Sequence, residues 1–561
     1  MKLIPDKKLA GILCPVFALR TANDLGIGDT EAVKEMIGWC HHHGLGILQL
    51  LPINETGPDN SPYNAISAMA LEPTTIATTP AMLPDLLPAD FDRLVTEEVR
   101  TALRTGPVCY RQVKALKREL LWAAFQRAGQ RKAVADFAKA NPWLSDYTLY
   151  RALLDENNGN DNWESWPVEH QSPANVPKAL LEKLAERRQF YAYVQWVAHE
   201  QWRDVRRFAE AQGVALMGDI PFGVSRYSAD VWGNRELFDL TWSGGAPPEP
   251  AFKPDEFTAK WGQNWGIPLY RWDTHKKQKF AWWHRRVRQT SAIFHLFRID
   301  HVLGFYRVFA FPWRPQENWQ FVVLDETQAK ERTQGRLPQF FPFADDTPAH
   351  QQVNCKHGEA LLAMIREAAG ETVVVAEDLG VVPEYVRPNL AKLGIPGFKI
   401  PYWERNQDYT FVAGAEYPRL SIVTPATHDH APLAGHWRQL WQAHETARAK
   451  QDHHNAYITW LELQRFVKWA GGDENNVPRE FTPALHESFC RRVLASNAWL
   501  AIFMITDVFA QEMRFNVPGP IAESNWTERL STTVAELDTD PHRRRQAHDL
   551  ARLVKETHRQ I

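Results

Sequence analysis

The chain has 561 residues, of which 44% are hydrophobic and 23% are charged, and its formal net charge is -3. This composition is that of an ordinary globular protein, and the charge balance argues against a nucleic-acid-binding surface. No apolar run approaches the roughly 18 residues that a membrane helix needs, and the N-terminus lacks the apolar core of a signal peptide. We therefore expect neither nucleic acid nor a membrane as a partner.

Eight short β-branched or apolar runs along the chain are typical of buried strands, and most are followed by amphipathic helical sequence such as 30–40 and 358–369. Alternating strands and helices predict a parallel sheet, and eight such units predict a closed (β/α)8 TIM barrel of the α/β class. The runs are residues 11–19, 46–53, 214–220, 293–299, 372–376, 397–401, 421–424 and 500–506.

Between the second and third runs lie about 160 residues, far too many for a loop. Much of this stretch has helical periodicity, at 92–105, 110–129, 132–140 and 177–210. We therefore expect residues 1–69 to form the first part of the barrel and 70–200 an inserted, mostly helical subdomain. Residues 201–561 then complete the barrel. Within them, 232–273 is rich in Pro, Gly, Trp and Phe, which predicts a structured active-site loop over the strand ends.

Five cysteines are scattered without a Cys-x-x-Cys pair, which argues against a disulfide framework or a zinc site and favours a reducing compartment. We expect a cytoplasmic protein. The run His41–His43 ends a predicted helix, and we expect it on the surface.

Acidic residues end several of the strand-like runs. Asp300, Glu377 and Asp429 each follow an apolar run, and Asp219 lies at the end of the third run. Carboxylates at the carboxyl ends of barrel strands line the cleft where such barrels carry their active sites. Paired carboxyl groups in that position are typical of glycoside chemistry.

The neighbours of these carboxylates indicate possible roles. Arg298 and Asp300 point to the same side of a strand, and the guanidinium would keep a nucleophilic carboxylate ionised; a purely structural ion pair is the alternative. Glu377, near other carboxylates, has the environment that raises the pKa of a general acid. His428 beside Asp429 suits hydrogen bonding to sugar hydroxyls. A metal site there is the alternative, but adjacent ligands seldom share one metal without distant partners, and we expect none.

Two further segments combine an aromatic ring with amide or hydroxyl groups. They are Ser61–Tyr63, after the second strand, and the stretch around Trp265 in the long loop. Aromatic faces stack on the C–H surfaces of sugar rings. Packed aromatic side chains in ordered loops are an equally good explanation of either segment alone.

Taken together, these segments and others in the same order resemble the amylomaltases, the 4-α-glucanotransferases of glycoside hydrolase family 77. The resemblance spans most of the chain, and although each motif is weak alone, the ordered set is specific. The motifs are residues 25–29 (Leu-Gly-Ile-Gly-Asp), 61–63 (Ser-Pro-Tyr), 218–221 (Gly-Asp-Ile-Pro), 265–270 (Trp-Gly-Ile-Pro-Leu-Tyr), 297–301 (Phe-Arg-Ile-Asp-His), 376–380 (Ala-Glu-Asp-Leu-Gly), 427–429 (Thr-His-Asp) and 514–519 (Arg-Phe-Asn-Val-Pro-Gly).

The resemblance implies a retaining transferase that acts on α-1,4-glucans and malto-oligosaccharides, with no metal or organic cofactor. It implies Asp300 as the nucleophile, Glu377 as the acid/base and Asp429 as the stabiliser of the transition state. The substrate-binding residues that it implies are Ser61, Tyr63, Asp219, Trp265, Arg298, His301, His428 and Asn516.

The chain departs from the family pattern at His430, at 302–305 (Val-Leu-Gly-Phe) and at the longer segment 247–257. These departures leave the catalytic trio intact and bear on acceptor choice, chain length and cyclisation. The alternatives are an α-glucan hydrolase of the α-amylase clan, a transferase with altered acceptor specificity, and a catalytically silent glycan-binding protein. A binding protein has no need for a nucleophile and an acid together. The sequence does not predict an oligomeric state.

Overall fold

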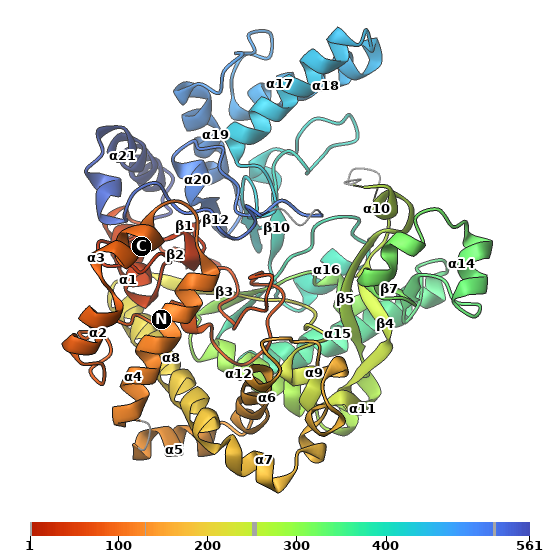
Figure 1. Cartoon of the computed structure of the whole chain (residues 1–561). Coiled ribbons are helices and arrows are strands. Elements are labelled where there is room, and N and C mark those ends of the chain that lie inside the picture. The colour runs from red at the N-terminus through yellow and green to blue at the C-terminus, as the bar shows by residue number, and fades with distance from the viewer. Residues whose placement is uncertain (1–2, 129–130, 250–254, 520–522) are drawn as a thin grey trace.

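A ring of parallel strands forms the centre of the protein (Figure 1). The computed structural model describes residues 3–128, 131–249, 255–519 and 523–561. Its eight-stranded sheet follows chain order from β1 round to β12, and every pair in it is parallel. The Ala376 N–H donates to the Pro396 carbonyl at 2.9 Å, which joins β9 to the start of β10 and closes the ring. The strands are β1 (Leu9–Leu13), β2 (Ile47–Gln49), β3 (Ala215–Ile220), β6 (Leu296–Ile299), β9 (Val373–Ala376), β10 (Gly397–Lys399), β11 (Ser421–Val423) and β12 (Leu500–Met504).

All eight predicted strands are confirmed, and the (β/α)8 barrel with them. The first strand is shorter than expected, ending at Leu13 instead of continuing to residue 19. Pro15 has no N–H to offer the sheet, and the chain turns there into a short 3-10 helix, Val16–Ala18. Every residue of β1 and β3 is buried, as expected for parallel strands covered on both faces.

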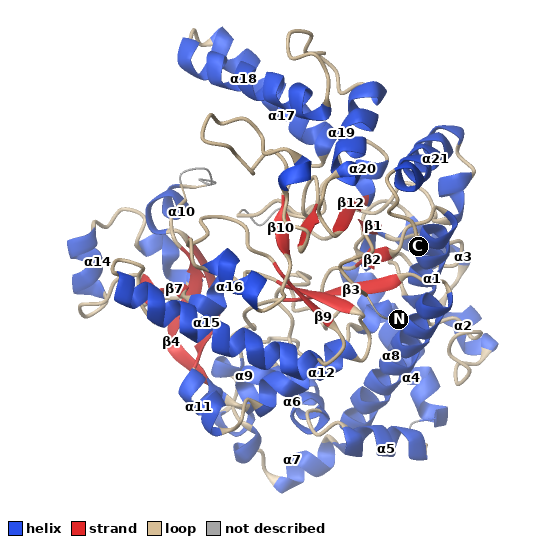
Figure 2. Ribbon diagram, turned by 180° about the vertical axis from the view of Figure 1, so that it is seen from behind, coloured by secondary structure: helices blue, strands red, loops and turns tan. Residues whose placement is uncertain are grey.

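Helices surround the strand ring and extend beyond it (Figure 2). None of the helices in the described ranges combines the length and apolar content needed to cross a bilayer. The helices that alternate with the barrel strands or follow the last of them are α1 (Thr30–His42), α8 (Ala185–Ala211), α12 (Ala281–Ser291), α15 (Pro348–Ala369), α16 (Val386–Lys392), α17 (Leu433–Ala449), α18 (His453–Ala470), α19 (Pro483–Ala495), α20 (Ile505–Val508) and α21 (Pro541–Glu556).

The long stretch between β2 and β3 is mostly helical, and α8 leads from it back to the barrel. The periodicity of the sequence did not indicate α6, and it predicted a single helical stretch, 92–105, where the structure has the end of α2 and then α3. Thr96 separates these two helices, because its side chain accepts a hydrogen bond from the Val99 N–H and caps α3. That residues 70–200 form a subdomain of their own remains a prediction. The helices before α8 are α2 (Pro88–Leu94), α3 (Glu97–Arg104), α4 (Tyr110–Ala128), α5 (Lys132–Ala140), α6 (Leu144–Glu156) and α7 (Lys178–Lys183).

A second sheet, antiparallel and four-stranded, lies beside the barrel (Figure 1). Its first two strands fall within 232–273, where the sequence predicted a structured loop without revealing these strands. That this segment covers the active site stays a prediction. Register shifts between Asp239 and Gly244 interrupt the alternation that reveals a strand in a sequence. The strands are β4 (Phe238–Ala246), β5 (Gln263–Tyr270), β7 (Val308–Phe311) and β8 (Gln339–Phe341), with helices α9 (Ala229–Gly233), α10 (Glu256–Trp261), α11 (Trp272–Lys277), α13 (Leu303–Tyr306) and α14 (Glu326–Arg332) around them.

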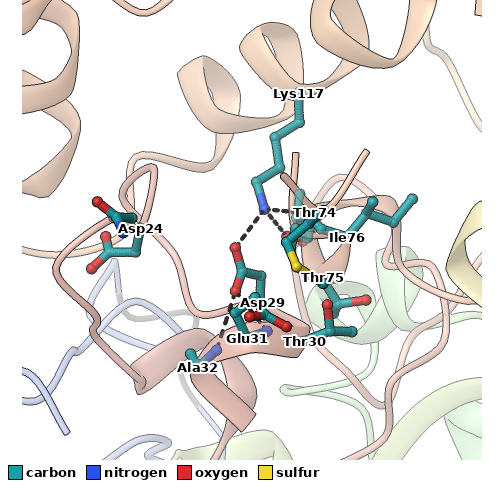
Figure 3. Close-up of polar contacts among 12 residues, drawn as sticks. Asp24, Asp29, Thr30, Glu31, Ala32, Thr74, Thr75, Ile76 and Lys117 are labelled. Atoms are coloured by element: carbon teal, nitrogen blue, oxygen red, sulfur yellow. Dashed lines mark hydrogen bonds and ion pairs between the residues drawn. The ribbon is translucent and has the colours of Figure 1, made fainter. Parts of the chain in front are cut away.

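A buried lysine joins the helical stretch to the barrel (Figure 3). The Lys117 side chain, on α4, is only 1% exposed, and its Nζ donates to the carbonyls of Thr74 at 2.5 Å and Ile76 at 2.7 Å. It also lies 3.8 Å from a carboxylate oxygen of Asp29, the residue that caps α1. One ammonium group therefore holds together the loops that follow β1 and β2.

We expect Lys117→Met to destabilise the protein by about 3–5 kcal/mol, because it leaves the Asp29 carboxylate buried without its cation. Chemical denaturation followed by circular dichroism measures this. Arg111→Met, an exposed change on the same helix, should stay within about 0.5 kcal/mol of the unmodified protein. Equal stability of the two variants would contradict the role assigned to Lys117.

Candidate active site

The three acidic residues proposed as catalytic lie at the carboxyl ends of the barrel strands. Asp300 directly follows β6, Glu377 directly follows β9, and Asp429 lies a short way beyond β11. Backbone hydrogen bonds continue the sheet to the first two, since the Asp300 N–H donates to Ile220 and the Glu377 N–H to Ile299, each at 3.0 Å. Their side chains are 27%, 17% and 35% exposed respectively. A substrate can therefore reach all three.

Arg298 contacts several of the predicted site residues at once. Its side chain, 4% exposed, lies with Nη2 2.8 Å from Asp300 Oδ1 and 3.7 Å from Glu377 Oε2. Because both oxygens contact the same nitrogen, the distance between them is at most the sum of these two contact distances. That sum does not exceed roughly 6.5 Å, the smallest separation of the two carboxyl groups in inverting enzymes. Nη1 donates to Asp219 and to Tyr63 Oη. Burial opposes the charge on Arg298, but these acids outweigh burial and raise its pKa, so the guanidinium stays cationic.

Glu377 is placed to hold a proton. Burial is the main cause that raises its pKa above the ordinary value of 4.5; Asp300 adds to this effect and Arg298 opposes it. The backbone N–H of His301 donates to Glu377 Oε2 at 2.7 Å. His301 has a φ of 46°, in the left-handed region that few residues other than glycine adopt. Backbone strain of this kind persists where the surrounding structure enforces it, and it clusters at functional sites.

Asp429 is held ionised by the groups around it. Asn516 Nδ2 donates to Asp429 Oδ1 at 2.6 Å, and His428 Nε2 lies 3.3 Å from the same oxygen. Arg514 Nη2 donates to the Asp429 backbone carbonyl at 2.6 Å. Burial acts to raise the pKa of Asp429, but His428 and Asn516 outweigh it and lower the pKa. A carboxylate that stays charged accepts hydrogen bonds well from hydroxyl groups.

Asp219 is more deeply buried than the three predicted catalytic acids. Its side chain is fully buried, and its Oδ2 accepts a hydrogen bond from Tyr63 Oη at 2.7 Å as well as one from Arg298. Burial raises the pKa of Asp219, while Arg298 acts in the opposite direction. The contacts fix the orientation of both Arg298 and the Tyr63 ring.

Aromatic rings flank the carboxylates. Tyr63 stacks on His428, with centroids 5.0 Å apart and an angle of 9° between the planes, and Trp526 packs 5.8 Å from Tyr63. Trp265, 38% exposed, lies with its ring 4.7 Å from the His301 ring and nearly perpendicular to it. These rings provide the flat apolar surfaces that suit a sugar.

The structure brings most of the predicted site residues together. Asp219, Arg298, Asp300, Glu377 and Tyr63 form one connected network, and the other predicted residues except Ser61 join it through the contacts above. Ser61 plays a different part in the described contacts, because its hydroxyl accepts a hydrogen bond from the Tyr63 N–H at 3.3 Å and shapes the turn before that ring.

Sequence reasoning assigned no role to three residues at or beside the predicted site. Arg514 lay within one of the motifs given above, and Trp526 lay beyond the last of them. Trp403, whose ring lies 4.6 Å from that of His430, follows the predicted strand 397–401 closely. Its position after a barrel strand was the signal that would have found it.

At residues 428–430, the place of the metal alternative, His430 makes contacts of its own. His430 Nδ1 shares a hydrogen bond of 2.7 Å with Thr427 Oγ1, and its ring faces Trp403. In the part of the chain that the structure describes, the one group with metal-ligand spacing is His42, His43 and Asp538, far from this cleft at the end of α1. The expectation that His41–His43 lies on the surface is confirmed for His41 and His42 but wrong for His43, which is buried and bonded to Asp538 at 2.9 Å.

All three departures from the family pattern lie beside predicted site residues. His430 directly follows Asp429. A side chain at Gly380, in the motif that carries Glu377, would meet Glu249 Oε1 at 3.2 Å, so the longer segment approaches that motif. Within 247–257, residues 250–254 lie outside the described residues. In the third departure, 302–305, the Val302 N–H donates to the Glu377 carbonyl at 3.2 Å, and a side chain at Gly304 would meet the Phe222 ring at 2.8 Å.

Comparison with known proteins identifies the family. The family model described as 4-alpha-glucanotransferase, glycoside hydrolase family 77, matches residues 14–534. The chain belongs to this family. It is 31% identical over 551 residues to a 4-alpha-glucanotransferase from Chlamydia caviae, covering 94% of this chain and 92% of that protein. It is 30% identical over 543 residues to one from Thermus thermophilus, covering 93% and 94%.

A solved structure of similar fold is the amylomaltase from Streptococcus agalactiae in complex with acarbose. It has a TM-score of 0.76 and 20% identity, and the match covers 99% of this chain and all of that one. At this identity the likeness concerns the fold, and it agrees with the barrel described above. Membership of the 4-α-glucanotransferase family makes the protein a glucan-transferring enzyme.

Proposed function

We propose that the protein transfers α-1,4-glucan segments from a malto-oligosaccharide donor to the 4-hydroxyl of an acceptor glucan or glucose, with retention of configuration. The match of the 4-α-glucanotransferase family to residues 14–534 carries this proposal. Asp300 and Glu377 both lie close to Nη2 of Arg298, at 2.8 and 3.7 Å. This supports retention of configuration, because retaining enzymes need their two carboxyl groups close together.

In the first step, Glu377 donates its proton to the glycosidic oxygen while Asp300 attacks the anomeric carbon. The bond between that carbon and the oxygen breaks, the carbon bonds to Asp300, and the fragment with the reducing end leaves. The raised pKa of Glu377 keeps its proton available near neutral pH. Arg298 Nη2, 2.8 Å from Asp300 Oδ1, fixes the orientation of the carboxylate that attacks.

In the second step, Glu377 takes the proton of an acceptor 4-hydroxyl, whose oxygen attacks the same carbon and releases Asp300. One α-1,4 bond has broken and one has formed, so the number of reducing ends is unchanged. Transfer prevails over hydrolysis where the site orients the acceptor and keeps water away. The aromatic rings of Tyr63 and Trp265 are suited to both tasks.

The remaining residues bind and position. Asp429 accepts hydrogen bonds from the hydroxyls of the reacting sugar, most strongly in the transition state, with Arg298 and His428 beside the same sugar. Asp219 acts on that sugar through Arg298 and Tyr63, which it holds in place. Tyr63 and Trp265 line the donor and acceptor sites. Ser61, His301 and Asn516 act through their contacts with Tyr63, Glu377 and Asp429.

We also propose that maltodextrins or glycogen are the substrates and that the enzyme acts in the cytoplasm. All five cysteines are free thiols, as is usual in a reducing compartment.

Incubation of the pure protein with maltotriose tests the function. We expect free glucose and a ladder of longer malto-oligosaccharides, with total reducing ends constant. Rising reducing ends without a ladder would identify an α-glucan hydrolase instead. No change in the maltotriose would contradict both activities and leave a binding protein.

A further inference from the structure

A loop beyond β10 presents aromatic side chains next to the active site. Residues 403–412, hereafter the 403–412 loop, carry Trp403 and Tyr409, which are 43% and 68% exposed. The Trp403 ring meets the His430 ring edge to face at 4.6 Å, and His430 follows Asp429 directly. The base of this loop is therefore continuous with the cleft.

The loop is a small hairpin with Tyr409 at its tip. Arg405 and Phe411 pair as an antiparallel bridge, and the Asn406 N–H donates to the Thr410 carbonyl at 2.9 Å. Asp408 accepts hydrogen bonds from the Thr410 N–H at 3.0 Å and from its hydroxyl at 2.6 Å. Tyr409 adopts a φ of 65°, a strained conformation for a residue with a bulky side chain. The turn thus holds an aromatic ring out in solvent at a cost in backbone energy.

Helix α18 supports the loop from one side. Arg405 makes a two-pronged contact with Glu462, with Nη2 2.7 Å from Oε2 and Nη1 3.3 Å from Oε1. At the end of the loop, the Trp469 Nε1–H donates to the Val412 carbonyl at 2.9 Å. Ile458, 40% exposed, lies one helical turn before Glu462 and so on the same face of α18. The 403–412 loop and this face of α18 therefore lie side by side, and Trp403, Tyr409 and Ile458 are exposed apolar side chains on them.

We propose that the surface formed by Trp403, Tyr409 and Ile458 binds the outer part of a long α-glucan chain whose inner part occupies the active site. This inference rests on the proposed function. An extended glucan that leaves the cleft past His430 meets Trp403 first and the Tyr409 ring next, and both offer flat faces for stacking on sugar rings. The surface gives the enzyme a preference for chains long enough to occupy the cleft and the 403–412 loop together, and maltotriose serves as the short-chain comparison.

Tyr409→Asn tests the proposal, because asparagine tolerates a positive φ and lacks the ring. We expect the KM for amylose, followed by loss of iodine staining, to rise roughly three- to tenfold with kcat unchanged. Retardation of the protein in a native gel containing amylose should fall in parallel. The kcat and KM for maltotriose, followed by glucose release, should stay as in the unmodified protein.

Tyr409→Phe, which keeps the ring, is the matched control and should behave as the unmodified protein does in every assay. Ile458→Ser should raise the KM for amylose in the same direction as Tyr409→Asn. An unchanged KM and gel retardation for amylose in Tyr409→Asn would overturn the proposal, and so would an equal rise in KM for maltotriose. Inactivity of the unmodified protein on maltotriose would overturn the proposed function instead, and the gel assay would still test the surface.

Discussion

Asp300→Asn should reduce glucan transfer by roughly 10⁴-fold or more while leaving the fold intact, since removal of a catalytic nucleophile has effects of this size. An amide cannot attack the anomeric carbon to form the glycosyl intermediate. The fold should survive because Arg298 keeps its contacts with Asp219 and Glu377. Glucose release from maltotriose measures the activity, and thermal unfolding measures the stability.

Asp239→Asn is a suitable control, because this carboxylate serves only its own turn in the described contacts, accepting hydrogen bonds from the N–H and hydroxyl of Thr241. We expect it to retain full activity. An active Asp300→Asn variant would refute the nucleophile assignment. A variant that loses both activity and cooperative unfolding would show instead that the Arg298–Asp300 pair is structural, the alternative that the sequence left open.

The barrel was predictable because each of its strands is buried on both sides and carries a short, nearly continuous apolar run. The second sheet was not, and β4 shows the reason. This strand is partly exposed, contains Gly244 and Gly245, and shifts register against β5, so neither an apolar run nor an alternating pattern marks it. Secondary structure that depends on tertiary pairing leaves little trace in local sequence.

The position of the site was predictable for a related reason. The carboxyl ends of barrel strands converge, so acids that follow separate runs, such as Asp300 and Glu377, were expected to meet. The sequence even indicated that Arg298 faces the same side as Asp300. It gave no sign that one nitrogen of Arg298 approaches both carboxylates, because that contact depends on how β6 and β9 pair.

The loops around the site were the hardest part to predict. Trp403 and Tyr409 lie in a segment with no periodicity, and the loop that carries them is held by a contact between Arg405 and Glu462, which are far apart in sequence. His43 shows the converse error. A run of histidines at a helix end is typical of an exposed surface. His43 is nevertheless buried, and Asp538, almost 500 residues later in the sequence, accepts a hydrogen bond from it.

The pH dependence of the enzyme should be set on its alkaline side by Glu377. This group must carry a proton to start the first step, and burial together with Asp300 raises its pKa. Activity should therefore persist through neutral pH and fall as the pH rises past the pKa of Glu377 and the acid ionises. Without the shift, the proton would be lost above the ordinary value of 4.5, and little activity would remain at pH 7.

Glu377→Gln should lower transfer from maltotriose by roughly 10²- to 10⁴-fold and remove this alkaline fall from the pH profile. A maltotriosyl fluoride donor should restore the first step, because fluoride leaves without a proton, and the glycosyl adduct on Asp300 should then accumulate and appear in the mass of the intact protein. Azide, which needs no general base, should release the adduct as an α-glycosyl azide: the bond from carbon to Asp300 breaks and a bond from carbon to nitrogen forms. If the variant keeps the alkaline fall, or if fluoride and azide restore nothing, the proton donor is another group. The raised pKa of Glu377 would then reflect only its burial beside Asp300.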